Sequence, residues 1–151
     1  MIGRLDDEQI EEILHSNNMG RIGCRDNDLI YVVPINYIYD GNSIIAHSVA
    51  GMKIEMMRKY PDVCFQVDQI KEYNNWKSVV AWGQYQELTG ERERYDAMKL
   101  FVERTLKLKI SETAIAPAKM KMSAFKIISV TKKSDISSFS SFSAPSNGIF
   151  R

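Results

Sequence analysis

Four residues in the segment 44–61 have the types and spacing of an anion site. His47 and Ser48 end a strand-like run, Gly51 follows in a turn, and Lys53 lies at the start of a short helical pattern. A hydroxyl, a glycine turn, free N–H groups at a helix start and a fixed positive charge together favour a phosphate or carboxylate. A solvated surface lysine also commonly follows a turn, so the spacing alone leaves both interpretations of Lys53 open.

His47 could also take part in chemistry, because imidazole changes protonation near neutral pH. It directly precedes the proposed anion turn, where it could donate a proton or contact a substrate. A histidine at the end of a strand is equally often a structural group whose hydrogen bonds are satisfied. The sequence does not decide between these roles.

A proline interrupts the apolar strand "LIYVVPINYIY" at position 34. Proline cannot donate to a strand ladder, so it indicates an edge strand or a bulge. Alternatively, the backbone beside Pro34 faces a flat ligand, and Asn36 offers it a donor or acceptor.

Two tryptophans, Trp76 and Trp82, flank the strand "WKSVVAW". Core or interface packing is the usual role of such residues. Ser78 and Val79 could still supply polar and backbone contacts to a ligand on a neighbouring subunit.

The elements that position these residues follow from periodicity and capping. Asp6 and Gln9 have the form of a capping box and start a helix that ends near Asn17. Alternating or apolar runs then predict strands at 19–25, 29–39, 43–48, 62–70 and 76–89, with a hairpin turn at Asp40–Asn42 and a short helix at 53–59. Gly83 indicates a bulge or bend.

The second half of the chain predicts one long helix and a final strand. The helix runs from Thr89 to about Leu108, with Tyr95, Met98, Val102 and Thr105 on one face and Phe101 beside them. A loop and a strand at 120–133 follow. This order predicts a mainly β fold, a small closed barrel with helices outside, in a single domain at 1–134 followed by a Ser/Phe-rich tail at 135–151.

Composition excludes several classes of partner. The 151 residues carry a net charge of +1, which argues against nucleic acid, and no apolar run approaches membrane-spanning length. The N-terminus resembles no signal peptide, so we expect a cytoplasmic protein. Cys24 and Cys64 are expected to be buried free thiols, and with His15 and His47 they offer no zinc spacing.

Four stretches in order, "GRIG", "YVVPINYIY", "IIAHSVAGMKIEMMRKYPDVCFQV" and "SVVAWGQYQEL", resemble the pyridoxamine 5'-phosphate oxidase-like FMN-binding split barrels. The resemblance covers roughly residues 19–88 and is strongest to the Nim-type branch, linked to 5-nitroimidazole resistance. It implies a six-stranded antiparallel split β-barrel that forms a homodimer, with FMN in the grooves between the subunits.

The resemblance also implies roles for single residues. Ser48 and Lys53 match the family's phosphate ligands, and His47 matches the histidine near the flavin in the Nim branch. The remaining expected cofactor contacts lie on the strand beside the flavin ring, in the turn, and on a strand of the second subunit: Val33, Pro34, Ile35, Asn36, Met52, Trp76, Ser78 and Val79.

The expected function is therefore an FMN-dependent oxidoreductase or reductase of a small molecule, such as a nitroaromatic, with NADH or NADPH as electron donor. The basic residues with which true pyridoxamine-phosphate oxidases hold their substrate are not evident, so we do not expect that reaction. The alternatives are a non-enzymatic flavin store or sensor, and a haem-binding barrel with His47 or His15 as axial ligand. A single-stranded nucleic-acid-binding barrel is disfavoured by the charge.

Overall fold

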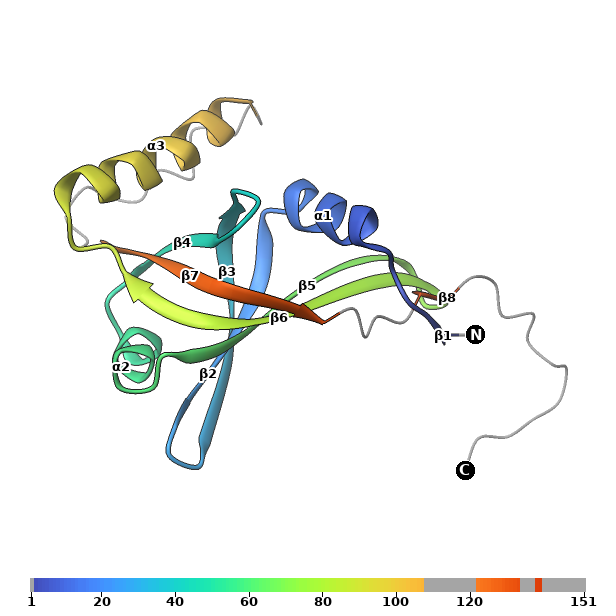
Figure 1. Ribbon diagram of the computed structural model, residues 1–151, viewed down its shortest axis with the longest axis horizontal. Helices are drawn as coiled ribbons and strands as arrows, with labels where there is room; N and C mark the ends of the chain where they lie inside the picture. The colour runs from blue at the N-terminus through green and yellow to red at the C-terminus, as the bar shows by residue number, and fades with distance from the viewer. Residues whose placement is uncertain (1, 108–121, 134–137, 140–151) are drawn as a thin grey trace, which may run out of the picture.

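The computed structural model of the protein describes residues 2–107, 122–133 and 138–139 (Figure 1). Six antiparallel strands form a closed barrel in the order β2-β3-β4-β7-β6-β5. Their bounds are β2 Met19–Asp26, β3 Leu29–Tyr39, β4 Ile44–Val49, β5 Asp62–Glu72, β6 Asn75–Glu87 and β7 Met122–Lys133. The mainly β barrel and its six strands confirm the predicted fold.

Among the described residues, three helices accompany the barrel: α1 Asp7–Ser16, α2 Met52–Lys59 and α3 Glu91–Lys107. Asp6 and Gln9 form the predicted capping box at the start of α1, with both reciprocal hydrogen bonds present. No helix within the described ranges is long and apolar enough to cross a membrane. The predicted loop at 111–119 and most of the tail lie outside the described residues.

Alternation along the strands builds one core inside the barrel. Inward side chains such as Tyr37, Phe65 and Phe125 are fully buried. Buried side chains of α1 and α2 belong to the same cluster, so these two helices extend the core beyond the strands. The hydroxyl of Tyr37 donates to the carbonyl of Leu14 at 2.9 Å, which satisfies the polar group that this burial removes from water.

The barrel bends where the sequence predicted it. The pairing of β6 with β7 shifts register between Trp82 and Gln84, at Gly83. At the β3–β4 turn, Gly41 has a positive φ of 95° and the Asp40 carboxylate accepts from the backbone N–H groups of Asn42 and Ser43. Both local predictions are confirmed.

The β5–β6 hairpin is longer than predicted and projects from the barrel (Figure 1). Lys71 and Glu72 belong to β5 rather than to a loop. Tyr73 at the tip is fully solvent-accessible. The end of the hairpin therefore lacks the pattern of buried residues from which its length could be predicted. Strands β1 (Ile2–Gly3) and β8 (Ser138–Phe139) pair with each other beside this arm.

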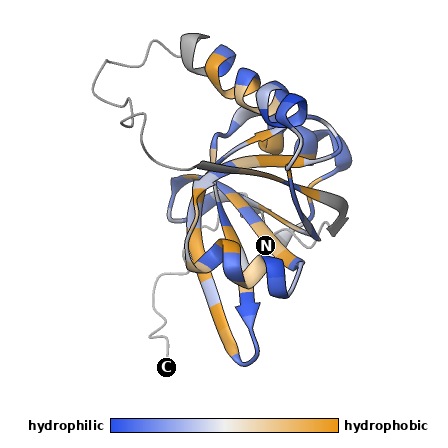
Figure 2. Cartoon of the chain, turned by 90° about the vertical axis from the view of Figure 1, so that its left-hand side faces the viewer, coloured by the Kyte–Doolittle hydropathy of each residue, from blue (hydrophilic) through white to orange (hydrophobic). Residues whose placement is uncertain are grey.

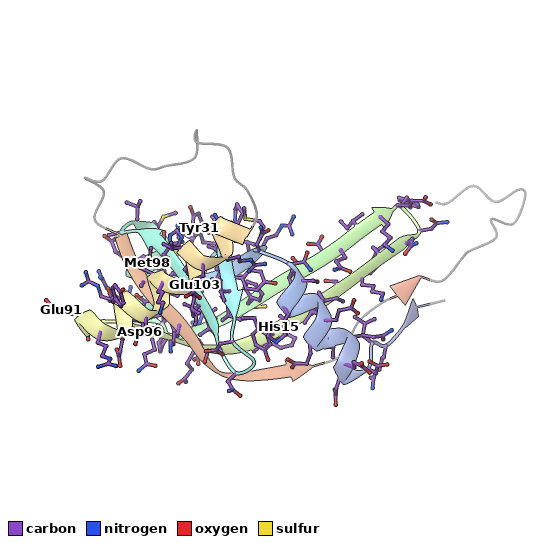
Figure 3. All side chains as sticks on the ribbon, turned by 90° about the horizontal axis from the view of Figure 1, so that it is seen from above. His15, Tyr31, Glu91, Asp96, Met98 and Glu103 are labelled. Atoms are coloured by element: carbon purple, nitrogen blue, oxygen red, sulfur yellow. The ribbon has the colours of Figure 1, made fainter. Side chains whose placement is uncertain are left out.

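Helix α3 lies across the barrel on the side away from the arm, as the positions of Asp96 and Glu103 show in Figure 3. It begins at Glu91 rather than at Thr89. Tyr95 and Val102 are 68% and 55% exposed, so the predicted apolar face is not the packed one. The helix instead packs through Ala97 and Phe101 against a small outer cluster of Ile45, Leu88 and Ala124.

Candidate functional site

The barrel is split along β3, and this split is the centre of the candidate site. Strand β3 pairs with β4 only through Tyr37, Ile38 and Tyr39, whereas β2 pairs with β3 along the whole range 29–36. Among the described residues, the opposite edge of β3 over Leu29–Asn36 therefore has no strand partner. Pro34 lies within this segment, and because the Tyr37 N–H donates to Asn18 on the β2 side, strand alternation turns the nitrogen of Pro34 to the free edge, where a proline costs no ladder hydrogen bond.

Alternation divides the four predicted β3 residues into two groups. Val33 and Ile35 point inward, where Ile35 is 5% exposed and Val33 packs against the core. Pro34 and Asn36 are exposed on the outer face. Val33 and Ile35 therefore offer no side chain to a ligand outside the barrel, whereas Asn36 can offer its side-chain amide.

Lys53 lies in the first turn of α2 and is half-buried. Burial raises the pKa of the Cys24 thiol, and the charge of Lys53 partly opposes this effect. The Cys24 Sγ lies 3.7 Å from the carbonyl oxygen of Tyr31 on β3. Within the described part of the chain, Lys53 forms no ion pair or hydrogen bond.

The backbone at Gly51, two residues before Lys53, has open space beside it. Gly51 caps α2 without a side-chain hydrogen bond, and its carbonyl accepts from Ile54 and Glu55. A Cβ built on Gly51 would meet no atom within 4 Å. Its φ of −176° is extended backbone that any residue adopts, so the glycine is not required by conformation. The N–H groups at this helix start carry the positive end of the α2 dipole and can receive an anion. Met52 beside them is 48% exposed.

Ser48 is 9% exposed and lies on the inward face of β4. Its hydroxyl donates to the carbonyl of Val49 at 2.9 Å. To donate to an anion at the start of α2, the hydroxyl would have to rotate away from that carbonyl. Its predicted role as a phosphate ligand stays a prediction.

His47 points to the other side of β4, toward α3. The imidazole meets the Phe101 ring edge to face, with centroids 4.5 Å apart and planes at 77°. Its Nδ1 atom is buried without a hydrogen-bond partner in the described part of the chain. Burial lowers the pKa of His47, because the cationic form loses more hydration than the neutral one. His47 and Ser48, although adjacent in sequence, therefore face different surroundings.

Within one chain, the residues of β6 that were predicted to contact the cofactor lie away from the free edge of β3. Val79 is 1% exposed and points into the barrel, whereas Ser78 is half-buried on the outer face. The Ser78 hydroxyl accepts from the side-chain amide of Gln66 at 2.9 Å. Trp76, also half-buried, follows the arm tip. A ligand at the free edge of β3 could meet these residues only from another copy of the chain.

A shallow hollow of about 1090 Å³ covers the outer face of β2, β3, β5 and β6. Its apolar lining includes Ile30, Val32 and Trp82, which are 76%, 59% and 44% exposed. Hydrophobic colouring runs along the β2–β3 hairpin toward its tip in Figure 2. Exposed apolar side chains gathered on one sheet face mark an interaction surface.

Sequence reasoning missed Arg104. Its guanidinium donates to the carbonyl of Tyr37 at 3.0 Å and to that of Asn17 at 2.7 Å, which joins α3 to β3 and to the end of α1. Tyr37 is also where β3 begins to pair with β4, so Arg104 holds α3 at the closed end of the split. An arginine in a charged helix gives no local signal of such a contact.

Arg58 is exposed and forms a bidentate ion pair with Glu87. Cys24 and Cys64 are both free thiols, as predicted, although Cys64 is only half-buried. The described ranges hold no cluster of three or more potential metal ligands.

Comparison with known proteins identifies the family. The model described as pyridoxamine 5'-phosphate oxidase matches residues 6–134. The chain belongs to the pyridoxamine 5'-phosphate oxidase family. Membership confirms the family predicted from the four sequence stretches, and it extends the match on both sides of them.

Several solved structures share the fold. A FAD-binding protein of Mesorhizobium loti is 30% identical, with a TM-score of 0.68, and the alignment covers 91% of this chain and 96% of that one. A putative 5-nitroimidazole antibiotic resistance protein of Bacteroides thetaiotaomicron is 20% identical, with a TM-score of 0.66 and coverage of 91% and 84%. A flavocytochrome of Azotobacter vinelandii is 17% identical, with a TM-score of 0.64 and coverage of 96% and 72%. The last two likenesses show the fold alone.

Among curated proteins, an uncharacterized protein of Rhizobium meliloti strain 1021 is 37% identical over 81 residues. The match covers 54% of this chain and 54% of that protein, so the chain spans about half the length of this curated relative.

Proposed function

We propose that the protein binds FMN at the free edge of β3 and uses it as an oxidoreductase of a small molecule. One observation carries the proposal: a half-buried lysine with no ion pair in the described part of the chain lies at an open helix start, in a barrel in which one edge of β3 is covered by no described strand. A phosphate and a flat heteroaromatic ring are the two chemical groups that these features suit.

The phosphate end would be held at the start of α2. Lys53 supplies the charge, the N–H groups that follow Gly51 supply donors, and the missing Cβ at Gly51 lets an anion approach the backbone. Ser48 would add its hydroxyl after turning from Val49, and Met52 would contact the ligand with its exposed side chain.

The ring end would lie along β3. The carbonyl of Pro34 and the backbone and side-chain amide of Asn36, which face away from β2, can match the alternating donors and acceptors of an isoalloxazine edge, while Val33 and Ile35, whose backbone groups face β2, would hold this edge in place. Pro34 lacks an N–H and so leaves no donor unsatisfied there. The bound flavin supplies the electron transfer, and the chain supplies position and shelter from water.

Two related cofactors fit the same chemistry, since FAD contains the phosphate and ring of FMN. The Mesorhizobium loti relative is named for FAD binding. We propose FMN because the described anion features gather around a single lysine, with no second cation assigned to a further phosphate.

We also propose a homodimer. The exposed apolar residues Ile30, Val32 and Trp82 of the outer face would be covered by a second copy. Trp76, Ser78 and the backbone of Val79 would then reach the flavin of the neighbouring subunit. Size-exclusion chromatography with light scattering would give twice the chain mass; a monomer at micromolar concentration would contradict this.

The proposed substrate is a small acceptor of electrons such as a nitroimidazole, with NADH or NADPH as donor. This substrate class is supported by the fold shared with the Bacteroides thetaiotaomicron protein and by His47, whose ring can offer an N–H to an oxygen of the substrate. His47 would orient the substrate rather than carry electrons.

The visible absorption spectrum tests the proposal first. Purified protein is mixed with FMN, FAD or riboflavin and then desalted. Twin flavin bands that survive desalting with FMN support the proposal, and NADPH-dependent bleaching followed by recovery with a nitroimidazole supports the activity. Retention of FAD alone would show that the cofactor is FAD rather than FMN. A haem band in the purified protein would show that the cofactor is a haem and not a flavin. No retained chromophore would refute flavin binding.

A further inference from the structure

The two nitrogens of His47 have different environments. Nδ1 is buried and has no hydrogen-bond partner among the described residues, while the side chain as a whole is only half-buried. Nε2 is not among the buried unsatisfied atoms, so it keeps access to the surroundings. One side of the imidazole is therefore closed and the other is open.

Phe101 of α3 packs on the imidazole. Its ring packs edge to face on the imidazole at 4.5 Å, and the backbone neighbour of His47 on the adjoining strand is the apolar Ala124. Neither residue offers a hydrogen-bond acceptor in its side chain. An N–H at Nδ1 would therefore be buried without a partner, a condition that folded proteins rarely tolerate.

The charged groups on the neighbouring elements do not favour a protonated ring. Lys126 of β7 pairs with Ile45, two residues from His47, and is a cation. On α3, Arg104 is a cation bound to two carbonyls, and Glu103 lies 3.9 Å from Lys99 in an exposed ion pair. Burial is the sole resolved cause of the shifted pKa of His47, with no carboxylate contributing.

Arg104 keeps Phe101 in place. The two residues are three positions apart on α3, so they lie on the same side of the helix. The two hydrogen bonds of Arg104 to backbone carbonyls fix this end of α3, whose other contacts with the barrel are few.

We propose that Phe101, held by Arg104, is a positioning residue that keeps His47 neutral, with its single N–H at Nε2 directed to the ligand. His47 then acts as a hydrogen-bond donor to an acceptor oxygen, such as a nitro, carbonyl or carboxylate oxygen, and not as a proton source, because a neutral imidazole is a very weak acid. This inference rests on the proposed function for the identity of the ligand, but the protonation of His47 can be tested without any ligand.

The test is long-range ¹H–¹⁵N NMR of the two histidine rings in the full chain, from pH 5.5 to 8. The chain has only His15 and His47, so a His15→Gln variant assigns the signals. We expect wild-type protein to show an unprotonated Nδ1 and a protonated Nε2 that change little between pH 6.5 and 8. Phe101→Leu retains an apolar cover and should keep this pattern.

Phe101→Ala should open Nδ1 to water, so that the two nitrogens average between tautomers and the pKa of His47 rises. Arg104→Met should move the pattern in the same direction by releasing α3. A protonated Nδ1 in the wild-type protein would overturn the proposal even if the Ala variant does not fold. An Ala variant that folds and is indistinguishable from wild type would overturn the role of Phe101.

Adding FMN separates this inference from the proposed function. If FMN does not bind, flavin binding fails, while the spectra of the free protein still decide the state of His47. If FMN binds and Nδ1 of His47 is protonated, the proposed function stands and the inference fails.

Discussion

Removing the charge of Lys53 should weaken binding of FMN but not of riboflavin, which lacks the phosphate. Lys53→Met is the sharpest change, because it keeps most of the half-buried aliphatic stem and deletes only the ammonium. No carboxylate in the described ranges pairs with this lysine, so the variant leaves no protein charge unpaired.

The size of the effect follows from the environment of the lysine. Two unit charges 4 Å apart attract by about 4 kcal/mol in the effective dielectric near a protein surface. Partial exposure and the hydration of the phosphate reduce this to the usual value for a hydrogen bond between charged groups, about 1.5–3 kcal/mol. The Kd for FMN should therefore rise roughly 10- to 150-fold, and added salt should narrow the difference.

The assay is fluorescence quenching of FMN and of riboflavin on titration with each protein. Lys99→Met is the matched control, since Lys99 lies on the exposed surface of α3 in a weak pair with Glu103. We expect Lys99→Met to bind both ligands like the wild type. Equal losses for FMN and riboflavin would show that Lys53 supports the fold rather than the phosphate, and no loss for FMN would refute the site at α2.

Three further predictions concern the frame of the site. Gly20→Ala places a methyl group against the buried Phe65 ring and should lower the free energy of unfolding by about 1–3 kcal/mol or more. Gly51→Ala places its methyl group in open space and should leave thermal stability unchanged. Equal melting temperatures of the two variants would contradict this prediction. Arg104→Met removes two hydrogen bonds to carbonyls and should cost about 1.5–3 kcal/mol in urea unfolding; a cost below the measurement error would show that α3 is held by other contacts. Burial lowers the pKa of His47 below its ordinary 6.5, so the unfolded chain takes up this proton first as the pH falls. The free energy of unfolding of the wild type, relative to that of His47→Gln, should therefore be constant above pH 6.5 and decrease below it. An increase of this relative stability toward acid would contradict the assignment.

Local structure was largely readable from the sequence. The capping box at Asp6, the Asp40–Gly41 turn and the bend at Gly83 all depend on residues close together in the chain, and all three are present. The bounds of β3 matched the prediction because its apolar run ends at turn residues on both sides. Such signals depend on residues close together in the chain, so a single short segment contains all the residues that produce them.

Side-chain direction around the site was less predictable. The adjacent residues His47 and Ser48 were expected to serve one ligand, yet strand alternation turns them to opposite faces. The face of α3 was misread because Tyr95, Met98 and Val102 form the larger apolar stripe, while the barrel offers its contact to Ala97 and Phe101. Helix periodicity gives a face but not the surface against which it packs.

The sequence by itself determined the mainly β class, the order of the elements, the family and the segment that carries Lys53. These depend on local propensity, on turn chemistry and on an ordered set of short motifs. Only the tertiary structure decided that β3 leaves β4 after three paired residues, that Lys53 keeps its charge unpaired among the described residues, and that Arg104 and Phe101 bring α3 to β3 and His47. The contacts of Arg104 and Phe101 join residues far apart in the chain, and barrel closure, rather than any local pattern, sets which of them meet.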